Sequence, residues 1–459
     1  MKKKIVAAML ASMMALSLAA CGGGSEGTTG GGESTGTTAT DETKGDAEKE
    51  EPEAAAATDD DNSLSVWCWD PNFNIYAIEK AAEIYAANGH DGFTVKVTEI
   101  QSDDIETKLT TAMSAGDLST LPDIFLMQDN SFQKYATNYP DIFVDLTDKG
   151  IDFTQFSEAK VAYSTLDGKN YGVPFDNGAA IGAYRTDLLE QAGYTVADFT
   201  DITWSDFMEK AKVVKEKTGQ PLLTQQAGAT DLIMMMIQSC GASCFNEDGS
   251  ANIKDNPAVK EAVEIYAQMV KDGTLVEVTD WDQYVASINN STVAGVINGC
   301  WIMATITAQD DQSGKWAITN LPKMEKAENG SNYSNNGGSS WAVTSNCKKP
   351  DVAVDFLKST FGGSTEFYDD LIAKGALATW APAGDSDVYN QDVAFFGGDQ
   401  VYAKIVDFAT KTPSNVTGPF YYDARDAIGV ALSQITQQGY DMDTALSEAQ
   451  DTVDFTMGG

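Results

Sequence analysis

Aromatic, carboxylate and amide side chains directly follow two predicted strands, and these residue types could bind or act on a ligand. Trp69 and Asp70 end an alternating segment, and Gln128 and Asp129 follow the short apolar run 123–127. Aromatic rings cover flat C–H surfaces, while carboxylate and amide oxygens accept hydrogen bonds from hydroxyl groups. This combination suits recognition of a sugar, although paired carboxylates beside aromatic rings would also serve glycoside hydrolysis.

The segments that must position these residues alternate between strand and helix. Period-two alternation predicts strands at 64–69 and 93–97, and the run 123–127 predicts a third strand that is covered on both faces. Residues 75–85 and 105–113 carry apolar side chains at helical spacing. Ligands of doubly wound sheets bind beyond the carboxyl ends of the strands, so we expect the four residues named above at the edge of a site.

Each of these residues also has a structural interpretation. Trp67 and Trp69 share one face of the first strand, so either could belong to the core, and we expect Trp67 to point inward with Trp69 nearer the rim. Asp129 could simply cap a helix.

The composition limits the class of protein. A chain of 459 residues exceeds what one hydrophobic core usually supports, so at least two lobes are expected. The 68 acidic residues outnumber the 30 basic ones and give a net charge of −38, which disfavours nucleic acid and anionic membrane surfaces. The charge favours a neutral or cationic ligand, although acidity also serves solubility.

Histidine and cysteine usage excludes several kinds of chemistry. His90 is the single histidine and lies in a predicted turn, so a two-histidine zinc helix is impossible and Ser–His or Cys–His catalysis is disfavoured. Besides Cys21 there are five cysteines, which cannot all pair and show no zinc-site spacing. Cys240 and Cys244 could form a local disulfide or remain buried thiols. We expect neither a metal site nor a cofactor.

The amino-terminal segment has the features of an export signal. Three lysines precede an apolar run at 5–20, which is shorter than the ~20 residues of a membrane-spanning helix. The run ends in Leu18-Ala19-Ala20-Cys21-Gly22, which resembles the lipobox of bacterial lipoproteins. The resemblance implies removal of a signal peptide, residues 1–20, and a lipid anchor on Cys21, although an ordinary signal peptide with an incidental cysteine is the alternative. Residues 21–62 lack large apolar side chains and predict a disordered acidic tether.

Two further segments resemble a known family. The run Gly337-Gly338-Ser339-Ser340-Trp341-Ala342-Val343 precedes an amphipathic helix that starts near Pro350. The run Tyr171-Gly172-Val173-Pro174 leads to Tyr184-Arg185-Thr186-Asp187-Leu188-Leu189. Both resemble the crossings between the lobes of extracellular solute-binding proteins of sugar ABC importers, and the resemblance covers about residues 64–455.

The resemblance implies an α/β fold of two doubly wound lobes, joined by hinge strands, with the ligand cleft between them. Lobe 1 would comprise residues 63–176 and 339–385, and lobe 2 would comprise residues 177–338 and 386–459. By the same resemblance, the cleft receives Asp176, Asn177, Trp301, Gly338, Ser339, Tyr421 and Asp423.

Trp301 and Tyr421 are the aromatic candidates among these, and we expect them to share one groove. The alternatives are that Trp301 is a core residue, that Asp176 and Asn177 only close a turn, and that Asp423 only caps a helix.

We therefore predict a lipid-anchored binding protein on the extracellular face of the bacterial cell membrane. It would close on a mono- or oligosaccharide and deliver it to the permease subunits of an ABC importer, acting as a monomer and not as an enzyme. A secreted cell-surface glycoside hydrolase is the main alternative, but no local motif marks an acid–nucleophile pair. An inert surface adhesin is a third.

Overall fold

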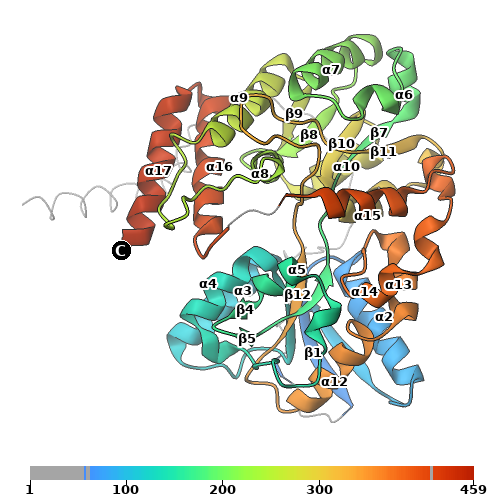
Figure 1. The fold of residues 1–459 in the computed structure, drawn as a ribbon, viewed down its shortest axis with the longest axis vertical. Helices are drawn as coiled ribbons and strands as arrows, with labels where there is room; N and C mark the ends of the chain where they lie inside the picture. The colour runs from blue at the N-terminus through green and yellow to red at the C-terminus, as the bar shows by residue number, and fades with distance from the viewer. Residues whose placement is uncertain (1–55, 58–61, 414–416, 459) are drawn as a thin grey trace, which may run out of the picture. The chain divides into compact units, whose positions relative to one another are not determined.

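The computed structural model describes residues 56–57, 62–413 and 417–458 (Figure 1). The predicted signal peptide and Cys21 lie outside the described residues, and so does the predicted tether apart from residues 56–57 and 62. The fold is mixed α/β and has two lobes, each built on its own strands, as the resemblance implied. Among the described residues, none of the helices combines the length and the apolar character needed to cross a membrane.

Lobe 1 contains a five-stranded sheet in the order β2-β1-β3-β12-β6. Strand β1 runs parallel to both β2 and β3, whereas β12 runs antiparallel to both β3 and β6. The strands are β1 (Ser63–Cys68), β2 (Thr94–Glu99), β3 (Ile124–Gln128), β6 (Val173–Asp176) and β12 (Ser339–Val343). The predicted β-α-β-α-β order of the first segment is therefore present.

Helices cover both faces of this sheet. The buried side chains on one face come mainly from α2, α12 and α13, and those on the other face come from α3 and α4. Trp67 is 1% exposed and belongs to the second of these cores, as predicted. The helices of lobe 1 are α2 (Asn74–Ala87), α3 (Ser102–Ala115), α4 (Asp129–Asn138), α5 (Glu158–Tyr163), α12 (Pro350–Thr360), α13 (Thr365–Leu371) and α14 (Ala381–Gly384). A small hairpin, β4 (Thr165–Leu166) and β5 (Lys169–Asn170), lies between α5 and β6.

Lobe 2 contains two smaller sheets. In the first, β7 (Ala180–Arg185) is the central strand between β10 (Gly295–Gly299) and β11 (Trp316–Thr319), and both pairings are antiparallel. In the second, β8 (Leu223–Gln226) is parallel to β9 (Leu275–Val278).

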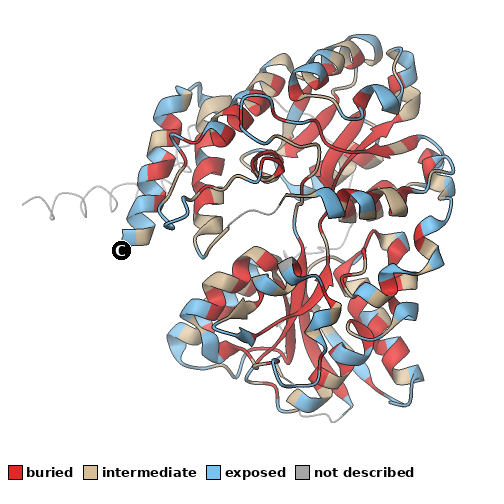
Figure 2. Cartoon of the chain, in the orientation of Figure 1, coloured by how far each residue is buried: buried red, intermediate tan, exposed pale blue. Residues whose placement is uncertain are grey.

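The helices of lobe 2 bury most of its apolar side chains. The largest core contains α7, α8, α9, α16 and α17, whereas α10, α11 and α15 pack with β7 and β10 in another. Figure 2 shows the buried residues on the strands and on the inner faces of the helices. These helices are α6 (Thr186–Gln191), α7 (Trp204–Thr218), α8 (Asp231–Ser239), α9 (Pro257–Asp272), α10 (Trp281–Asn289), α11 (Met303–Ile306), α15 (Val401–Lys411), α16 (Tyr421–Gln438) and α17 (Met442–Gly458).

Two crossings of the chain lie side by side between the lobes (Figure 1). One joins β6 to β7 and the other leads into β12, and they are bridged where Ala179 pairs with Asn335. Asn336 N donates a hydrogen bond to Gly178 O at 2.7 Å. A Cβ on Gly178 would lie 2.1 Å from Asn336 O, so this close approach requires glycine.

Candidate functional site

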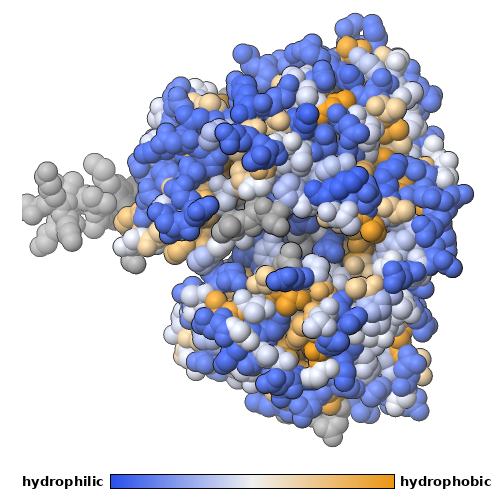
Figure 3. All heavy atoms as spheres, viewed as in Figure 1, coloured by the Kyte–Doolittle hydropathy of each residue, from blue (hydrophilic) through white to orange (hydrophobic). Residues whose placement is uncertain are grey.

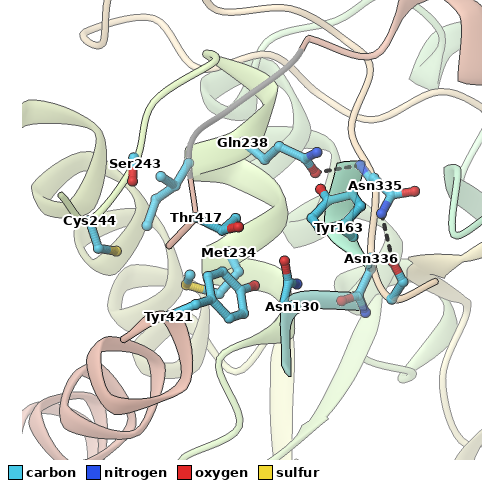
Figure 4. A pocket seen from close by; sticks show the side chains of 12 residues that line it. Asn130, Tyr163, Met234, Gln238, Ser243, Cys244, Asn335, Asn336, Thr417 and Tyr421 are labelled. Atoms are coloured by element: carbon cyan, nitrogen blue, oxygen red, sulfur yellow. Dashed lines mark hydrogen bonds between the residues drawn. The ribbon is translucent and has the colours of Figure 1, made fainter. Parts of the chain in front are cut away.

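A pocket lies where the two lobes meet the second crossing (Figure 4). The cavity that water-sized molecules can occupy has a volume of about 30 Å³, and the space free of atoms between its walls is about 440 Å³ when the part that opens to solvent is included. Lobe 1, the crossing and lobe 2 all contribute to its wall. The lining residues are Asn130, Tyr163, Met234, Ile237, Gln238, Ser243, Cys244, Asn335, Asn336, Gly337, Thr417 and Tyr421.

The lining is polar, aromatic and uncharged. Four amide side chains and two hydroxyl side chains provide hydrogen-bond donors and acceptors, while two tyrosines, two sulfur-containing residues and an isoleucine provide apolar surface. None of these twelve residues carries a charge at neutral pH. Such a pocket suits a neutral ligand that has both hydroxyl groups and C–H faces. Figure 3 shows that the molecular surface is indented between the two lobes.

Among the lining residues, Asn130 has a buried side-chain oxygen that lacks a hydrogen-bond donor in the described structure. It lies in the first turn of α4, because that helix begins directly after β3 ends. Its Oδ1 is buried from solvent and accepts no hydrogen bond from the residues that the structure describes. A buried acceptor without a partner is costly, so a ligand hydroxyl that donates to Oδ1 would relieve this cost.

Amide contacts fix the crossing that forms one wall. Gln238 on α8 accepts hydrogen bonds from Asn335 N at 2.8 Å and Ser334 Oγ at 3.1 Å. Asn336 Nδ2 donates to Asn298 Oδ1 at 2.7 Å. The backbone at this wall is therefore held in place before any ligand binds.

Two tyrosines supply the aromatic surface. Tyr163 ends α5, Tyr421 begins α16, and both side chains point toward the space that Asn130 faces (Figure 4). Burial raises the pKa of Tyr163 to about 12 and raises the pKa of Tyr421 above its ordinary value as well. Both hydroxyls are therefore protonated at neutral pH and can donate hydrogen bonds.

Asp129 belongs to a buried network beside the pocket. Lys160 Nζ donates to Asp129 Oδ2 and, at 2.9 Å, to Ser339 O, and Ser340 Oγ donates to Asp129 Oδ1 at 3.0 Å. Asp129 is 3% exposed, and burial raises its pKa to about 6 while the Lys160 ammonium lowers it. A Cβ on Gly338 would lie 2.6 Å from Asp129 Oδ2, which explains a glycine at this position.

Asp176 joins the same network from the end of β6. Its Oδ1 accepts hydrogen bonds from Ser339 N at 2.8 Å and from Ser339 Oγ at 2.6 Å. It is 2% exposed, and burial raises its pKa although Lys160 and Ser339 oppose the shift. The carboxylates of Asp129 and Asp176 are thus occupied by contacts that hold β12 to β6 and α4.

Trp69 and Asp70 lie at the carboxyl end of β1, as predicted, but they are not among the residues that line the pocket. Trp69 is half-buried between the two lobe 1 cores. Asp70 Oδ1 accepts a hydrogen bond from Asn72 N at 2.8 Å, and Asp70 O accepts one from Ile75 N at 2.9 Å. Burial raises the pKa of Asp70. Asp70 therefore shapes the turn that leads into α2.

Trp301 lies next to the pocket wall. It is half-buried against cores of both lobes, and its Nε1 donates to Asn336 O at 2.9 Å. Asn177 lies in the first crossing, where its carbonyl oxygen accepts a hydrogen bond from Cys300 Sγ at 3.3 Å. Trp301 thus contacts a lining residue, and it is not among the lining residues itself.

Gln128 and Asp423 make contacts between the lobes. Gln128 Oε1 accepts a hydrogen bond from Tyr422 Oη, and Asp423 Oδ2 lies 3.8 Å from Lys134 Nζ. Among the described residues, Tyr421 is therefore the one predicted site residue that lines this pocket. The five described cysteines are free and buried, so Cys240 and Cys244 are thiols in this structure.

Several lining residues escaped the sequence reasoning. Asn335 and Asn336 directly precede the predicted crossing and Gly337 begins it, so their place beside Gly338 was an available signal. Asn130 follows Asp129 and faces the pocket although Asp129 does not. Gln238 had no comparable signal, because only the packing of α8 brings it to the crossing.

Two lobes, paired crossings and a pocket enclosed by both lobes define a protein that binds a small molecule between hinged bodies. Residues 80–397 match the bacterial extracellular solute-binding protein family. The chain belongs to this family.

Individual relatives agree with this assignment. A lactose-binding protein of Rhizobium radiobacter is 38% identical over 389 residues, which cover 84% of this chain and 91% of the relative. An arabinooligosaccharide-binding protein of Halalkalibacterium halodurans is 23% identical over 376 residues, which cover 77% of this chain and 80% of the relative.

A solved structure shows the same fold. It is the ABC transporter associated binding protein from B. animalis subsp. lactis Bl-04 in complex with β-1,6-galactobiose, with a TM-score of 0.73 at 21% identity. The match covers 86% of this chain and 98% of that protein.

Proposed function

We propose that the protein captures a neutral mono- or oligosaccharide in the pocket between its lobes and delivers it to an ABC importer. The observation that carries this proposal is the uncharged pocket, in which tyrosine rings face amide groups and the Asn130 Oδ1 acceptor has no partner in the described part of the chain. The two relatives named above bind lactose and arabino-oligosaccharides, which supports a sugar as the ligand class.

Isothermal titration calorimetry tests this proposal. Lactose, β-1,6-galactobiose and arabino-oligosaccharides are the first probes, and we expect at least one to bind with roughly micromolar affinity, or about −8 kcal/mol. Galactose and galacturonic acid form a matched pair, and the acid should bind more weakly, because its carboxylate would be desolvated in a pocket whose lining offers no compensating charge. Binding of a peptide or a polyamine, without binding of any sugar, would refute the proposal.

Anchoring on the extracellular face of the membrane through Cys21 is part of the proposal. The lipobox-like segment before Cys21 supports it. In bacteria fed a labelled fatty acid, the wild-type protein should become labelled and sediment with membranes. Cys21→Ala should abolish the label, and a label that persists would contradict the anchor at this residue.

We also assign residues 63–176 and 339–385 to lobe 1, and residues 177–338 and 386–459 to lobe 2. The membership of β6 and β12 in one sheet and the packing of α16 and α17 with α8 and α9 support this division.

The absence of turnover with chromogenic glycosides, together with binding of the parent sugar, would separate a binding protein from the alternative glycoside hydrolase.

A further inference from the structure

Four side chains connect the lobes beside the pocket without lining it. Gln128 and Lys134 belong to lobe 1, while Tyr422 and Asp423 belong to the first turn of α16 in lobe 2. Tyr422 Oη donates to Gln128 Oε1, and Lys134 Nζ lies 3.8 Å from Asp423 Oδ2. We call these four residues the inter-lobe contact.

The lobe 2 half of the inter-lobe contact is built into its surroundings. The Arg425 guanidinium lies 5.4 Å from the centre of the Tyr422 ring, and Arg425 Nη2 donates to Asp231 Oδ1 at 3.2 Å. The Tyr422 ring also packs edge-on against Tyr421, with 5.1 Å between the ring centres. Because Tyr421 lines the pocket, Tyr422 links the inter-lobe contact directly to the site.

The ion pair is in a setting where it matters more than an ordinary surface pair. Asp423 Oδ2 is buried from solvent, and none of the described residues donates a hydrogen bond to it. The Lys134 ammonium compensates its charge from the other lobe, while the Lys134 side chain is 36% exposed. When the lobes separate, Asp423 regains water but loses this partner.

We propose that the inter-lobe contact holds the lobes closed over the pocket and so sets how readily a bound ligand is released. The proposal rests on the proposed function for the identity of the ligand, but not for the closure itself. The Tyr422–Gln128 hydrogen bond joins α16 to the end of β3, and the Lys134–Asp423 ion pair joins α16 to α4, so both form only while α16 lies against lobe 1. The ligand then adds its own contacts to an equilibrium that the inter-lobe contact already biases toward closure.

Two variants of the full chain, purified in detergent, break the contact with little change in shape. Tyr422→Phe removes one hydroxyl, and Lys134→Met removes one charge. Matched controls within lobe 2 are Tyr440→Phe, at an exposed tyrosine, and Lys260→Met, which breaks the 2.9 Å surface pair with Asp443. Single-molecule energy transfer between one dye on each lobe reports the closed fraction, and stopped-flow mixing with lactose reports dissociation.

We expect both contact variants to lower the closed fraction without ligand and to speed lactose dissociation roughly three- to tenfold, as the loss of one hydrogen bond or partly buried pair implies. Both controls should match the wild type. The charge exchange Lys134→Asp with Asp423→Lys should restore at least part of the closed fraction.

Two results separate this proposal from the proposed function. An unchanged closed fraction and dissociation rate in both contact variants, while Asn130→Ala weakens lactose binding, would overturn the inter-lobe contact alone. A reduced closed fraction in a protein that binds no sugar would support the contact and refute the proposed function.

Discussion

The pocket lies beside a buried polar network that we call the hinge network, formed by Asp129, Lys160, Asp176, Ser339 and Ser340. Both regions are polar and largely buried, but their polar groups differ in whether they have hydrogen-bond partners. In the hinge network, Lys160 and Ser340 engage both carboxylate oxygens of Asp129, and Ser339 engages Oδ1 of Asp176. In the pocket, by contrast, the buried Asn130 Oδ1 has no partner among residues 62–413 and 417–458. A polar residue at a strand end therefore stabilises the fold when the protein already supplies its hydrogen-bond partners. It can bind a ligand when the protein does not supply them.

Two neighbouring glycines mark the boundary between these regions. Gly337 lines the pocket, whereas Gly338 covers Asp129. Substitutions on the hinge side should therefore reduce stability, and substitutions on the pocket side should reduce affinity.

Lys160→Met should produce the largest effect. It leaves Asp129 and Asp176 buried without the nearby ammonium, and loss of one partner from a buried ion pair typically costs about 3–5 kcal/mol of unfolding free energy. Urea unfolding followed by circular dichroism measures it. Lys169→Met is the control, because that exposed lysine lies 3.9 Å from Asp145 and should contribute at most about 0.5 kcal/mol. Equal losses in both variants would contradict the comparison.

The pH dependence of the unfolding free energy tests how the protonation of Asp129 contributes to stability. Burial raises its pKa from 3.8 to about 6, so the native state binds the proton more tightly than the unfolded chain. The stability from this group is fully present below pH 3.8 and is lost as the pH rises through about 6, by up to about 1.4 kcal/mol per pH unit.

Asp129→Asn should remove this part of the slope in urea unfolding measured from pH 4 to 7. Asp176→Asn serves as a second variant, because burial also raises the pKa of that carboxyl group. A slope in Asp129→Asn that equals the wild-type slope would show that Asp129 does not titrate in this range.

Gly338→Ala should have an intermediate effect on stability. Gly338 has φ of +102°, and an added Cβ would lie 2.6 Å from Asp129 Oδ2, so the substitution adds both backbone strain and a steric clash. We expect a loss of about 2 kcal/mol in thermal or urea unfolding. Gly397→Ala is the control for backbone strain alone, because φ is +70° there and nothing lies within 4 Å of the added Cβ. A loss no larger than that of the control would argue against the clash.

Asn130→Ala should have the smallest effect in energy, and on affinity instead of stability. Removal of one ligand hydrogen bond should weaken sugar binding by about 1 kcal/mol, or roughly fivefold. The unfolding free energy should not fall, because no described residue donates a hydrogen bond to the wild-type Oδ1. Asn138→Ala, at the exposed end of the same helix, should change neither quantity. Calorimetry would contradict the assignment if Asn130→Ala bound as tightly as the wild type.

Residue type and spacing were enough to predict the first three strands of lobe 1, the two helices between them and the two segments that cross between the lobes. Apolar alternation at Trp67 and the run before Gln128 reflect burial on sheet faces, which is a local property of each segment. Trp69 and Asp70 were correctly expected at a strand end, because the end of an alternating pattern is also local.

Only the tertiary structure decided which polar groups face the ligand space. Asp129 and Asn130 are adjacent in the sequence, but Lys160 and Ser340 engage the first, and the second faces the pocket. Tyr163 and Gln238 reach the same pocket from opposite lobes because helix packing brings them there. Whether a polar side chain is already satisfied depends on partners far away along the chain, and residue type and spacing do not contain that information.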